Sequence, residues 1–258
     1  MTLERRAETR RLLVALDFDG TLSPLVDEPM TARALPESKA AVARLVALPD
    51  TIVAFVSGRS LADLRVIAEH DDASPIWLAG SHGAEQWRPA GAPAAPVTSD
   101  PAQDALVAEL TADAQHLVDG IEGAWIEPKR FGFGLHTRTA GETETAKAQA
   151  AIDALVAERA SGWRRRTGRD LIEFAWRHEG KDSVIAELRQ ATGATGVLFA
   201  GDDVTDEDAL RSLGEDDLGV KVGDGETAAS VRVHDIPALA ALLDRLADLR
   251  GAGGREAE

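Results

Sequence analysis

The sequence predicts an α/β fold with a parallel-sheet core and an inserted α+β unit. Near both ends of the chain, apolar segments of strand length alternate with segments of helical periodicity, which favours a parallel sheet. Between them, residues 88–103 are rich in Pro, Ala and Gly, and runs of strand-like residues broken by two amphipathic helices follow. We therefore assign residues 1–86 and 178–258 to the core and residues 87–177 to the inserted unit.

The first part of the core alternates strands and helices. The run Leu12–Leu16 is wholly apolar and predicts a buried strand. The next helix is expected to stop at Pro49, and Ser60 is a suitable N-cap for the one after it. The predicted elements are, in order, a strand at 12–16, a helix within 36–50, a strand within 51–59, a helix within 60–71 and a short strand within 75–85.

The inserted unit opens with residues 88–103, which predict a linker or exposed loop. Apolar spacing then predicts two helices, and alternating segments predict strands, including one hairpin. The elements are, in order, a helix within 104–120, the hairpin within 124–138, a helix within 142–160 and further strand within 163–176.

The last part returns to the pattern of the core. A helix begins at Lys181, and the segment 236–250 predicts a final amphipathic helix. Between them we expect a strand within 196–203, a helix within 206–214 and a short strand within 218–224. Residues 251–258 are predicted to form a disordered tail.

Composition excludes several classes of function. The net charge of -16 argues against a nucleic-acid-binding protein, which needs a basic face. Without cysteine, disulfides, thiolate catalysis and Cys-based zinc sites are excluded. No signal peptide is evident near the start and no apolar run is long enough to span a bilayer, so we expect no membrane association and a cytoplasmic location.

Acidic residues follow two of the predicted strands. Asp17 and Asp19 come directly after the first strand, and the segment "FAGDDVTDE" places Asp202 and Asp203 after another, with Asp206 a turn later. The carboxyl ends of parallel strands meet at one edge of the sheet, where open α/β sheets bind ligands. Carboxylates so close together require a cation, and oxygen-only ligands favour Mg²⁺. We predict a magnesium ion shared by Asp17 and Asp202.

Hydrogen-bond donors are expected at the same edge. The segment Ser57-Gly58-Arg59 ends the second strand, where its hydroxyl and N–H groups suit an anion, and Lys181 begins a helix. Such a site suits phosphoryl transfer, in which an Asp attacks phosphorus and a second Asp protonates the leaving alcohol and then activates water.

Four segments resemble, in order, the motifs of the haloacid-dehalogenase-like (HAD) phosphatases: "DFDGT", "SGR", the isolated Lys181 and "GDDVTD". The resemblance implies a Rossmann-like core with the inserted unit as a cap. It implies Asp17 as nucleophile, Asp19 as general acid and base, and Ser57 and Lys181 as phosphate anchors. It also implies Mg²⁺ on the Asp17 carboxylate, the Asp19 main-chain carbonyl and Asp202. The remaining implied ligands or neighbours of the ion are Asp203 and Asp206.

Finer matches resemble the trehalose-6-phosphate phosphatase family. They are "GSHGAE" at 80–85, "EPK" at 127–129, "LHTR" at 135–138 and "GDDVTDE" at 201–207. The resemblance implies that Glu127, Lys129 and Glu173 hold the sugar hydroxyls. It places Arg59 and His82 beside the substrate as well.

The chain departs from that family at a few positions. Thr137 stands where the family usually has Tyr, and Trp176 and Asp182 interrupt its usual pattern near Lys181. These changes spare the four catalytic motifs but bear on the identity of the sugar. For His136 and Arg138 a structural role is expected. Three tryptophans are expected to pack the cap, with sugar stacking as the lesser alternative: Trp125, Trp163 and Trp176.

The predicted activity is therefore Mg²⁺-dependent hydrolysis of trehalose 6-phosphate to trehalose and inorganic phosphate. One alternative is a phosphatase for another sugar or polyol phosphate, such as that of glucosylglycerol or mannosylglycerate. The other is a non-catalytic phosphosugar sensor that regulates a partner. A functional link to trehalose-6-phosphate synthase is also expected.

Overall fold

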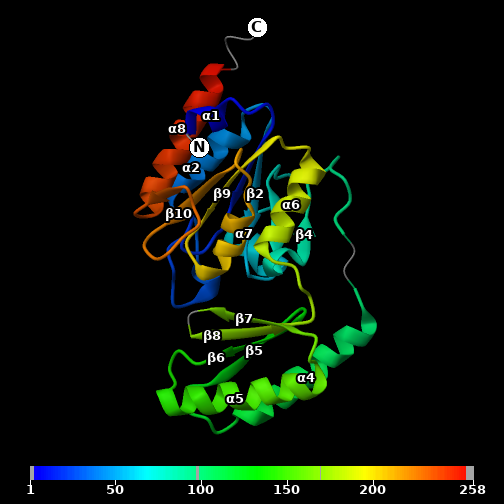
Figure 1. The fold of residues 1–258 in the computed structure, drawn as a ribbon. Helices are drawn as coiled ribbons and strands as arrows, with labels where there is room; N and C mark the ends of the chain where they lie inside the picture. Colours follow the sequence, from blue (N-terminus) through cyan, green and yellow to red (C-terminus); the bar gives the residue numbers. More distant parts are fainter. Residues whose placement is uncertain (1–2, 97–98, 169, 254–258) are drawn as a thin grey trace. The chain divides into compact units, whose positions relative to one another are not determined.

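The computed structural model describes residues 3–96, 99–168 and 170–253, which form two compact units (Figure 1). The core unit comprises the chain up to Pro96 and from Glu179 onward. The inserted unit is Val97–His178, where the sequence assigned 87–177. No helix in the described ranges has the length and apolar character needed to cross a membrane.

The core unit contains a seven-stranded sheet in the order β11-β10-β9-β1-β2-β3-β4. All neighbouring strands are parallel except the last pair, β3 and β4. In sheet order the strands are Val231–Val233, Leu218–Val222, Gly196–Gly201, Leu12–Leu16, Thr51–Val56, Trp77–Gly80 and Glu85–Trp87. β1 lies at the centre because its residues are all apolar and can be buried on both faces.

Helices cover both faces of this sheet. Side chains of β1 alternate between two apolar clusters: Leu12, Val14 and Leu16 pack with α2, α3 and α8, whereas Leu13 and Ala15 pack with α6 and α7. The short helix α1 packs on α8. The helices are α1 (Leu3–Ala7), α2 (Pro36–Val46), α3 (Leu61–Ile67), α6 (Lys181–Thr192), α7 (Glu207–Ser212) and α8 (Ile236–Gly253). Single 3₁₀ turns lie at Pro29–Thr31, Ser81–Gly83 and Val204–Asp206. The layered, parallel α/β core predicted from the sequence is confirmed.

The inserted unit has a four-stranded antiparallel sheet in the order β5-β6-β8-β7. Two long helices cover one face, where Leu110, Phe133 and Ile152 belong to a single buried cluster. The elements are α4 (Pro101–Val118), β5 (Trp125–Lys129), β6 (Gly132–His136), α5 (Glu142–Arg159), β7 (Arg164–Gly168) and β8 (Leu171–Ala175). The alternate side chains of these strands lie on the other face of the sheet, which these helices do not cover.

Several boundaries differ from the sequence expectation for local reasons. α4 begins at Pro101, inside the predicted linker, because Asp100 caps it by accepting hydrogen bonds from the N–H groups of Ala102 and Gln103, and Pro fits the first helical turn. The segment 163–176 forms two strands, with Asp170 in the left-handed region at φ 54° between them. Of the predicted tail, residues 254–258 lie outside the described residues, whereas α8 continues to Gly253.

Candidate active site

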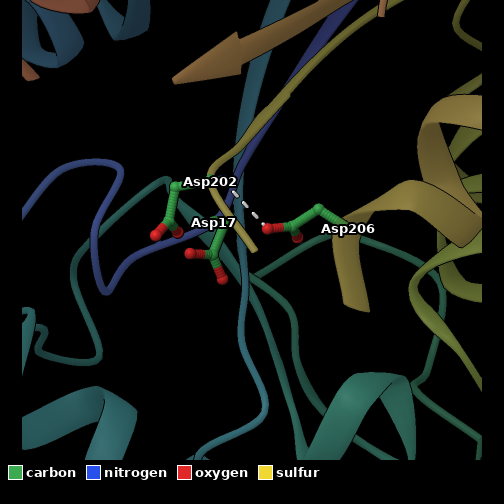
Figure 2. Close-up of side chains that lie close together, drawn as sticks. All are labelled: Asp17, Asp202 and Asp206. Atoms are coloured by element: carbon green, nitrogen blue, oxygen red, sulfur yellow. Dashed lines mark hydrogen bonds between the residues drawn. The ribbon is translucent and has the colours of Figure 1, made fainter. Parts of the chain in front are cut away.

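Two neighbouring parallel strands bring acidic residues together at the carboxyl edge of the core sheet. β1 pairs with β9 so that Leu16 lies opposite Ala200, and Asp17 and Asp202 follow. The backbone N–H of Asp17 donates to the Ala200 carbonyl at 2.9 Å. One carboxylate oxygen each of Asp17, Asp202 and Asp206 lie within 4.8 Å of one another (Figure 2). The predicted convergence of the two acidic segments is therefore present.

Glycine permits this close approach. Gly20 has φ +79°, and a Cβ atom there would clash with the Asp202 carboxylate. Gly201 lies equally close to the side chain of Asp206. Both glycines of "DFDGT" and "GDDVTD" are thus required by the packing of the acids against the backbone.

Asp206 organises the loop after β9. Its Oδ2 accepts hydrogen bonds from the backbone N–H groups of Asp202 (3.0 Å) and Asp203 (2.9 Å). Its Oδ1 accepts from Lys181 Nζ at 2.5 Å. These donors occupy both carboxylate oxygens of Asp206, so its geometry suits an anchor more than a free metal ligand. Asp203 contributes a backbone donor here, and its carboxylate is outside the group of three.

Lys181 is buried between two carboxylates. Only 3% of the residue is exposed, and Nζ donates to Asp17 Oδ1 as well as Asp206 Oδ1, at 2.5 Å in each case. Burial lowers the pKa of Lys181, but the charges of Asp17 and Asp206 outweigh it and raise the pKa above its ordinary value. The ammonium therefore stays charged at neutral pH.

Burial has the opposite effect on the acids. It raises the pKa of Asp17 well above its ordinary value, despite the attraction of Lys181, and the charges of Asp206 and Asp202 raise it further. Burial, followed by repulsion from Asp206, raises the pKa of Asp202 to about 6. The ammonium groups of Lys181 and Lys221 lower the pKa of Asp202, and that of Lys181 lowers the pKa of Asp17, yet both pKa values stay raised. The oxygen-only donor set therefore fits an additional hard cation.

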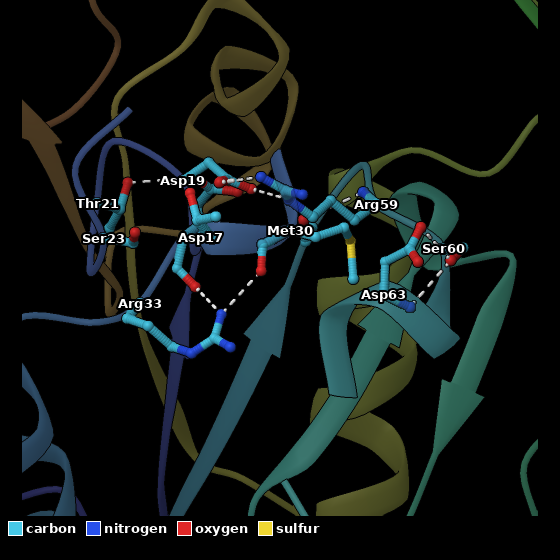
Figure 3. A network of polar contacts seen from close by, with 12 residues as sticks. Asp17, Asp19, Thr21, Ser23, Met30, Arg33, Arg59, Ser60 and Asp63 are labelled. Carbon is cyan, nitrogen blue, oxygen red and sulfur yellow. Dashed lines mark hydrogen bonds and ion pairs between the residues drawn. The ribbon is translucent and has the colours of Figure 1, made fainter. Parts of the chain in front are cut away.

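Asp19 pairs with Arg59. Nε of Arg59 donates to Asp19 Oδ2 at 2.6 Å and Nη2 donates to Oδ1 at 2.7 Å, a bidentate arrangement (Figure 3). Thr21 Oγ1 lies 3.3 Å from both Asp17 Oδ2 and Asp202 Oδ1. In the first motif, Asp17 thus belongs to the group of three carboxylates and Asp19 pairs with the "SGR" segment.

Ser57 and His82 lie together after β2 and β3. Ser57 is buried, its Oγ accepts from the Arg59 N–H at 3.1 Å, and its carbonyl accepts from the His82 N–H at 2.9 Å. His82 has φ 57°, and its ring packs so closely on Gly58 that a Cβ there would lie 2.8 Å from His82 Cε1. Hydrogen bonds and close packing thus bring Ser57, Arg59 and His82 together from the loops after β2 and β3 of the core unit.

The predicted sugar-binding residues form a separate cluster within the inserted unit. Lys129 Nζ contacts Glu173 Oε1 and lies 3.5 Å from Glu127 Oε2, which also bonds His136 Nε2 at 2.7 Å. The hydrogen bond from His136 lowers the pKa of Glu127. Burial lowers the pKa of Lys129, but Glu173 and Glu127 outweigh it and raise the pKa. All three predicted residues come together on the sheet face opposite the helices.

From the sequence, one participant was missed and two were given too little weight. Lys221 is 3% exposed and donates to the Asp202 carbonyl at 2.5 Å; a charged residue inside the apolar strand "LGVKV" was the available signal. His136 joins the Glu127 cluster, beyond the structural role expected of it. Trp125 lies on the sheet face opposite the helices at 39% exposure, so it does not pack into the interior of the inserted unit, and the sugar-stacking alternative stays open. The sequence does indicate this position, because Trp125 is two residues from Glu127 on one strand and alternate side chains share a face.

Comparison with known proteins identifies the family. The family described as trehalose-phosphatase matches residues 15–235. The chain belongs to this family. A trehalose-phosphate phosphatase from Mycolicibacterium paratuberculosis is 38% identical over 264 residues, covering 95% of this chain and 64% of that protein. This chain thus spans a little under two thirds of that relative's length.

Solved structures confirm the fold of this trehalose-phosphatase family member. The C-terminal domain of the C. albicans trehalose-6-phosphate phosphatase is similar with a TM-score of 0.77 at 19% identity, covering 95% of both chains. A haloacid dehalogenase-like hydrolase from B. subtilis is similar with a TM-score of 0.59 at 14% identity, covering 91% of this chain and 99% of that one. The HAD-like architecture implied by the four motifs is therefore confirmed.

Proposed function

We propose that this chain is a Mg²⁺-dependent phosphatase that hydrolyses trehalose 6-phosphate to trehalose and inorganic phosphate. The observation that carries the proposal is the group of buried Asp17 and Asp206 and partly buried Asp202 with Lys181, at the carboxyl edge of a trehalose-phosphatase family core. Buried, incompletely neutralised charge at a sheet edge is typical of a catalytic site.

The chemistry follows from the roles of the two acids of "DFDGT". An oxygen of Asp17 attacks phosphorus, the bond from phosphorus to the sugar oxygen breaks, and Asp19 gives its proton to that oxygen. Asp19 then takes a proton from water, which attacks the aspartyl phosphate, releases inorganic phosphate and restores Asp17. Both Asp19 oxygens accept hydrogen bonds from Arg59 in the structure. At least one of these hydrogen bonds must break before Asp19 can donate a proton to the sugar oxygen.

Cationic groups balance the phosphate charge. Lys181 and the Ser57 hydroxyl anchor the phosphate, with Arg59 and His82 beside it. The Asp17 carboxylate, the Asp19 carbonyl and Asp202 would hold Mg²⁺, with Asp203 and Asp206 orienting the loop around it. The bound ion would offset the negative charge that the phosphoryl oxygens carry in the transition state.

The inserted unit would supply the specificity. We assign binding of the sugar hydroxyls to Glu127, Lys129 and Glu173, because charged side chains make strong, directional hydrogen bonds. The range 87–177 is retained as the proposed substrate-specificity (cap) domain. A cytoplasmic location and a functional link to trehalose-6-phosphate synthase remain predictions from the sequence.

One departure from the family keeps another sugar or polyol phosphate as the alternative substrate. Thr137 replaces the usual Tyr; it is buried, and its N–H donates to the Asp170 carbonyl at 2.9 Å. A non-catalytic sensor is less favoured, because binding alone does not need a nucleophile and a second acid two residues later.

The test is phosphate release from trehalose 6-phosphate, glucose 6-phosphate and glucosylglycerol phosphate, with Mg²⁺ and with EDTA. We expect rapid release from trehalose 6-phosphate only, abolished by EDTA. Release from a different substrate would overturn the sugar assignment and retain the chemistry. No release from any of them would favour the sensor.

A further inference from the structure

The open face of the inserted sheet carries a stacked aromatic pair. The rings of Trp125 on β5 and His136 on β6 lie 4.7 Å apart with an interplanar angle of 4°. The two residues are directly opposite in the antiparallel register. The His136 ring covers one side of the indole, yet Trp125 remains 39% exposed. An ordered, exposed indole on a polar face is typical of a binding surface.

The stack is joined to the charged cluster. His136 Nε2 bonds Glu127 Oε2 at 2.7 Å, and Lys129 lies 3.5 Å from the same oxygen. Both contacts use Oε2, so among the described residues Glu127 Oε1 has no hydrogen-bond partner. An aromatic face and an available carboxylate oxygen therefore lie side by side, supported by one pair of strands.

Glycines allow close packing on this face. Gly132 and Gly134 share the face with Trp125, Glu127 and Lys129 in the strand register. A Cβ on Gly134 would lie 3.0 Å from Leu171 Cδ1, 3.3 Å from Lys129 Cε and 3.6 Å from Glu127 Oε2. Because Gly134 has no side chain, Lys129, Glu127 and Leu171 pack over it, and the charged cluster stays next to the stack.

We propose that Trp125 is a stacking platform for a neutral glycosyl ring of the substrate, with His136 holding the indole in place and Glu127 accepting a ring hydroxyl. A pyranose has an apolar C–H face that suits an indole and hydroxyls at its edge that suit a carboxylate. The Glu127 carboxylate beside the stack disfavours a phosphate there. The ring on Trp125 is therefore the one that carries no phosphate, which makes the site select disaccharide phosphates over monosaccharide phosphates.

This inference rests on the proposed function, which names the substrate of the kinetic test and the sugar of the binding test. In steady-state kinetics with trehalose 6-phosphate, Trp125→Ala should raise KM about tenfold, equivalent to about 1.4 kcal/mol, and change kcat by less than about threefold. Trp125→Phe keeps an aromatic face and should recover most of the loss. Trp163→Phe, which replaces an indole packed near Phe133 in the same unit, should leave both constants unchanged.

The binding test uses phosphate-free trehalose and intrinsic tryptophan fluorescence. The wild-type chain and Trp163→Phe should both change emission on titration, whereas Trp125→Phe should not. An unchanged KM in Trp125→Ala, an emission change that persists in Trp125→Phe, or no change in the wild type would each overturn the stacking site. If the wild type fails to hydrolyse trehalose 6-phosphate, the proposed function fails, and the titration still decides the stacking site.

Discussion

The two sheets of this protein present their polar side chains in opposite ways. The core sheet is buried on both faces, and its candidate catalytic residues Asp17, Ser57 and Asp202 come just after strand ends. The inserted sheet is buried on one face, and its polar residues Glu127, Lys129 and Glu173 lie within the strands. A fully covered parallel sheet has only its edge available for chemistry, whereas a half-covered antiparallel sheet offers a whole face.

The difference in burial between the two sheets determines how strongly the charged residues of each site interact. Lys181 and Asp17 are almost wholly buried and interact strongly, because low dielectric amplifies charge interactions. The Glu127 side chain is 46% exposed, so solvent screens its contacts. We therefore expect substitutions in the core site to change the reaction and those in the inserted sheet to change affinity and selectivity.

The largest expected effect is that of Asp17→Asn. The amide has nearly the same shape as the carboxylate but cannot attack phosphorus, so turnover of trehalose 6-phosphate should fall by at least about 10⁴-fold. Phosphate release at saturating Mg²⁺ is the measurement. Turnover within tenfold of the wild type would contradict a covalent mechanism at Asp17.

A matched control is Asp217→Asn, at the amino edge of the same sheet. Asp217 is buried and bonds Arg189 twice, at 2.8 Å each. Its loss should lower the free energy of unfolding by about 3 kcal/mol and leave kcat within about twofold. The pair of variants separates a buried acid used for chemistry from one used for stability.

Gly20→Ala tests whether packing of backbone against acid fixes the core site. The new methyl group clashes with the Asp202 carboxylate and also strains a backbone at φ +79°. We expect phosphate release to fall by about 10²-fold, as when reacting groups are displaced by about 1 Å. Gly91→Ala is the control, because Gly91 has φ +85° but nothing lies within 4 Å of the new Cβ.

Gly91→Ala should cost only the strain of the left-handed backbone, about 1–2 kcal/mol of unfolding free energy, with full activity. Equal losses of activity in the two variants would show that backbone strain, and not contact with Asp202, limits the site.

Lys221→Met tests whether the contact between Lys221 and the Asp202 backbone contributes to binding of the proposed Mg²⁺. Its ammonium donates to the Asp202 carbonyl at 2.5 Å, and such outer contacts affect metal affinity by about 10–100-fold. The Mg²⁺ concentration for half-maximal phosphate release should rise accordingly, and calorimetric titration of Mg²⁺ checks this without turnover. Lys39→Met, which removes an exposed partner of Glu69, should leave Mg²⁺ affinity unchanged. An unchanged Mg²⁺ affinity in Lys221→Met would assign that residue to packing alone.

The contrast between the two sheets also explains which parts of the structure could be predicted from the sequence. Apolar runs ending in acids specify both a buried parallel strand and its edge, so Asp17 and Asp202 could be placed side by side from the sequence. In the inserted unit, the strand pairs that bring Glu173 to Lys129 depend on the register of β6 with β8, and no local pattern encodes that register. Lys221 was missed because its partners are the backbone carbonyl of Asp202 and the Glu207 carboxylate of α7, and no local sequence pattern marks either contact.

The smallest predicted effect is a pH dependence in the inserted sheet. The hydrogen bond from His136 lowers the pKa of Glu127 below its ordinary value of 4.5, so the ionised carboxylate stabilises the folded state above that pH. This contribution is lost as the pH falls through the lowered pKa. Glu127→Gln should therefore reduce the unfolding temperature slightly at pH 7 and match the wild type well below pH 4.5. A difference in unfolding temperature that persists in acid would show that Glu127 stabilises the fold through its shape and not through its charge. The charged cluster of the inserted sheet would then make no electrostatic contribution to stability at Glu127.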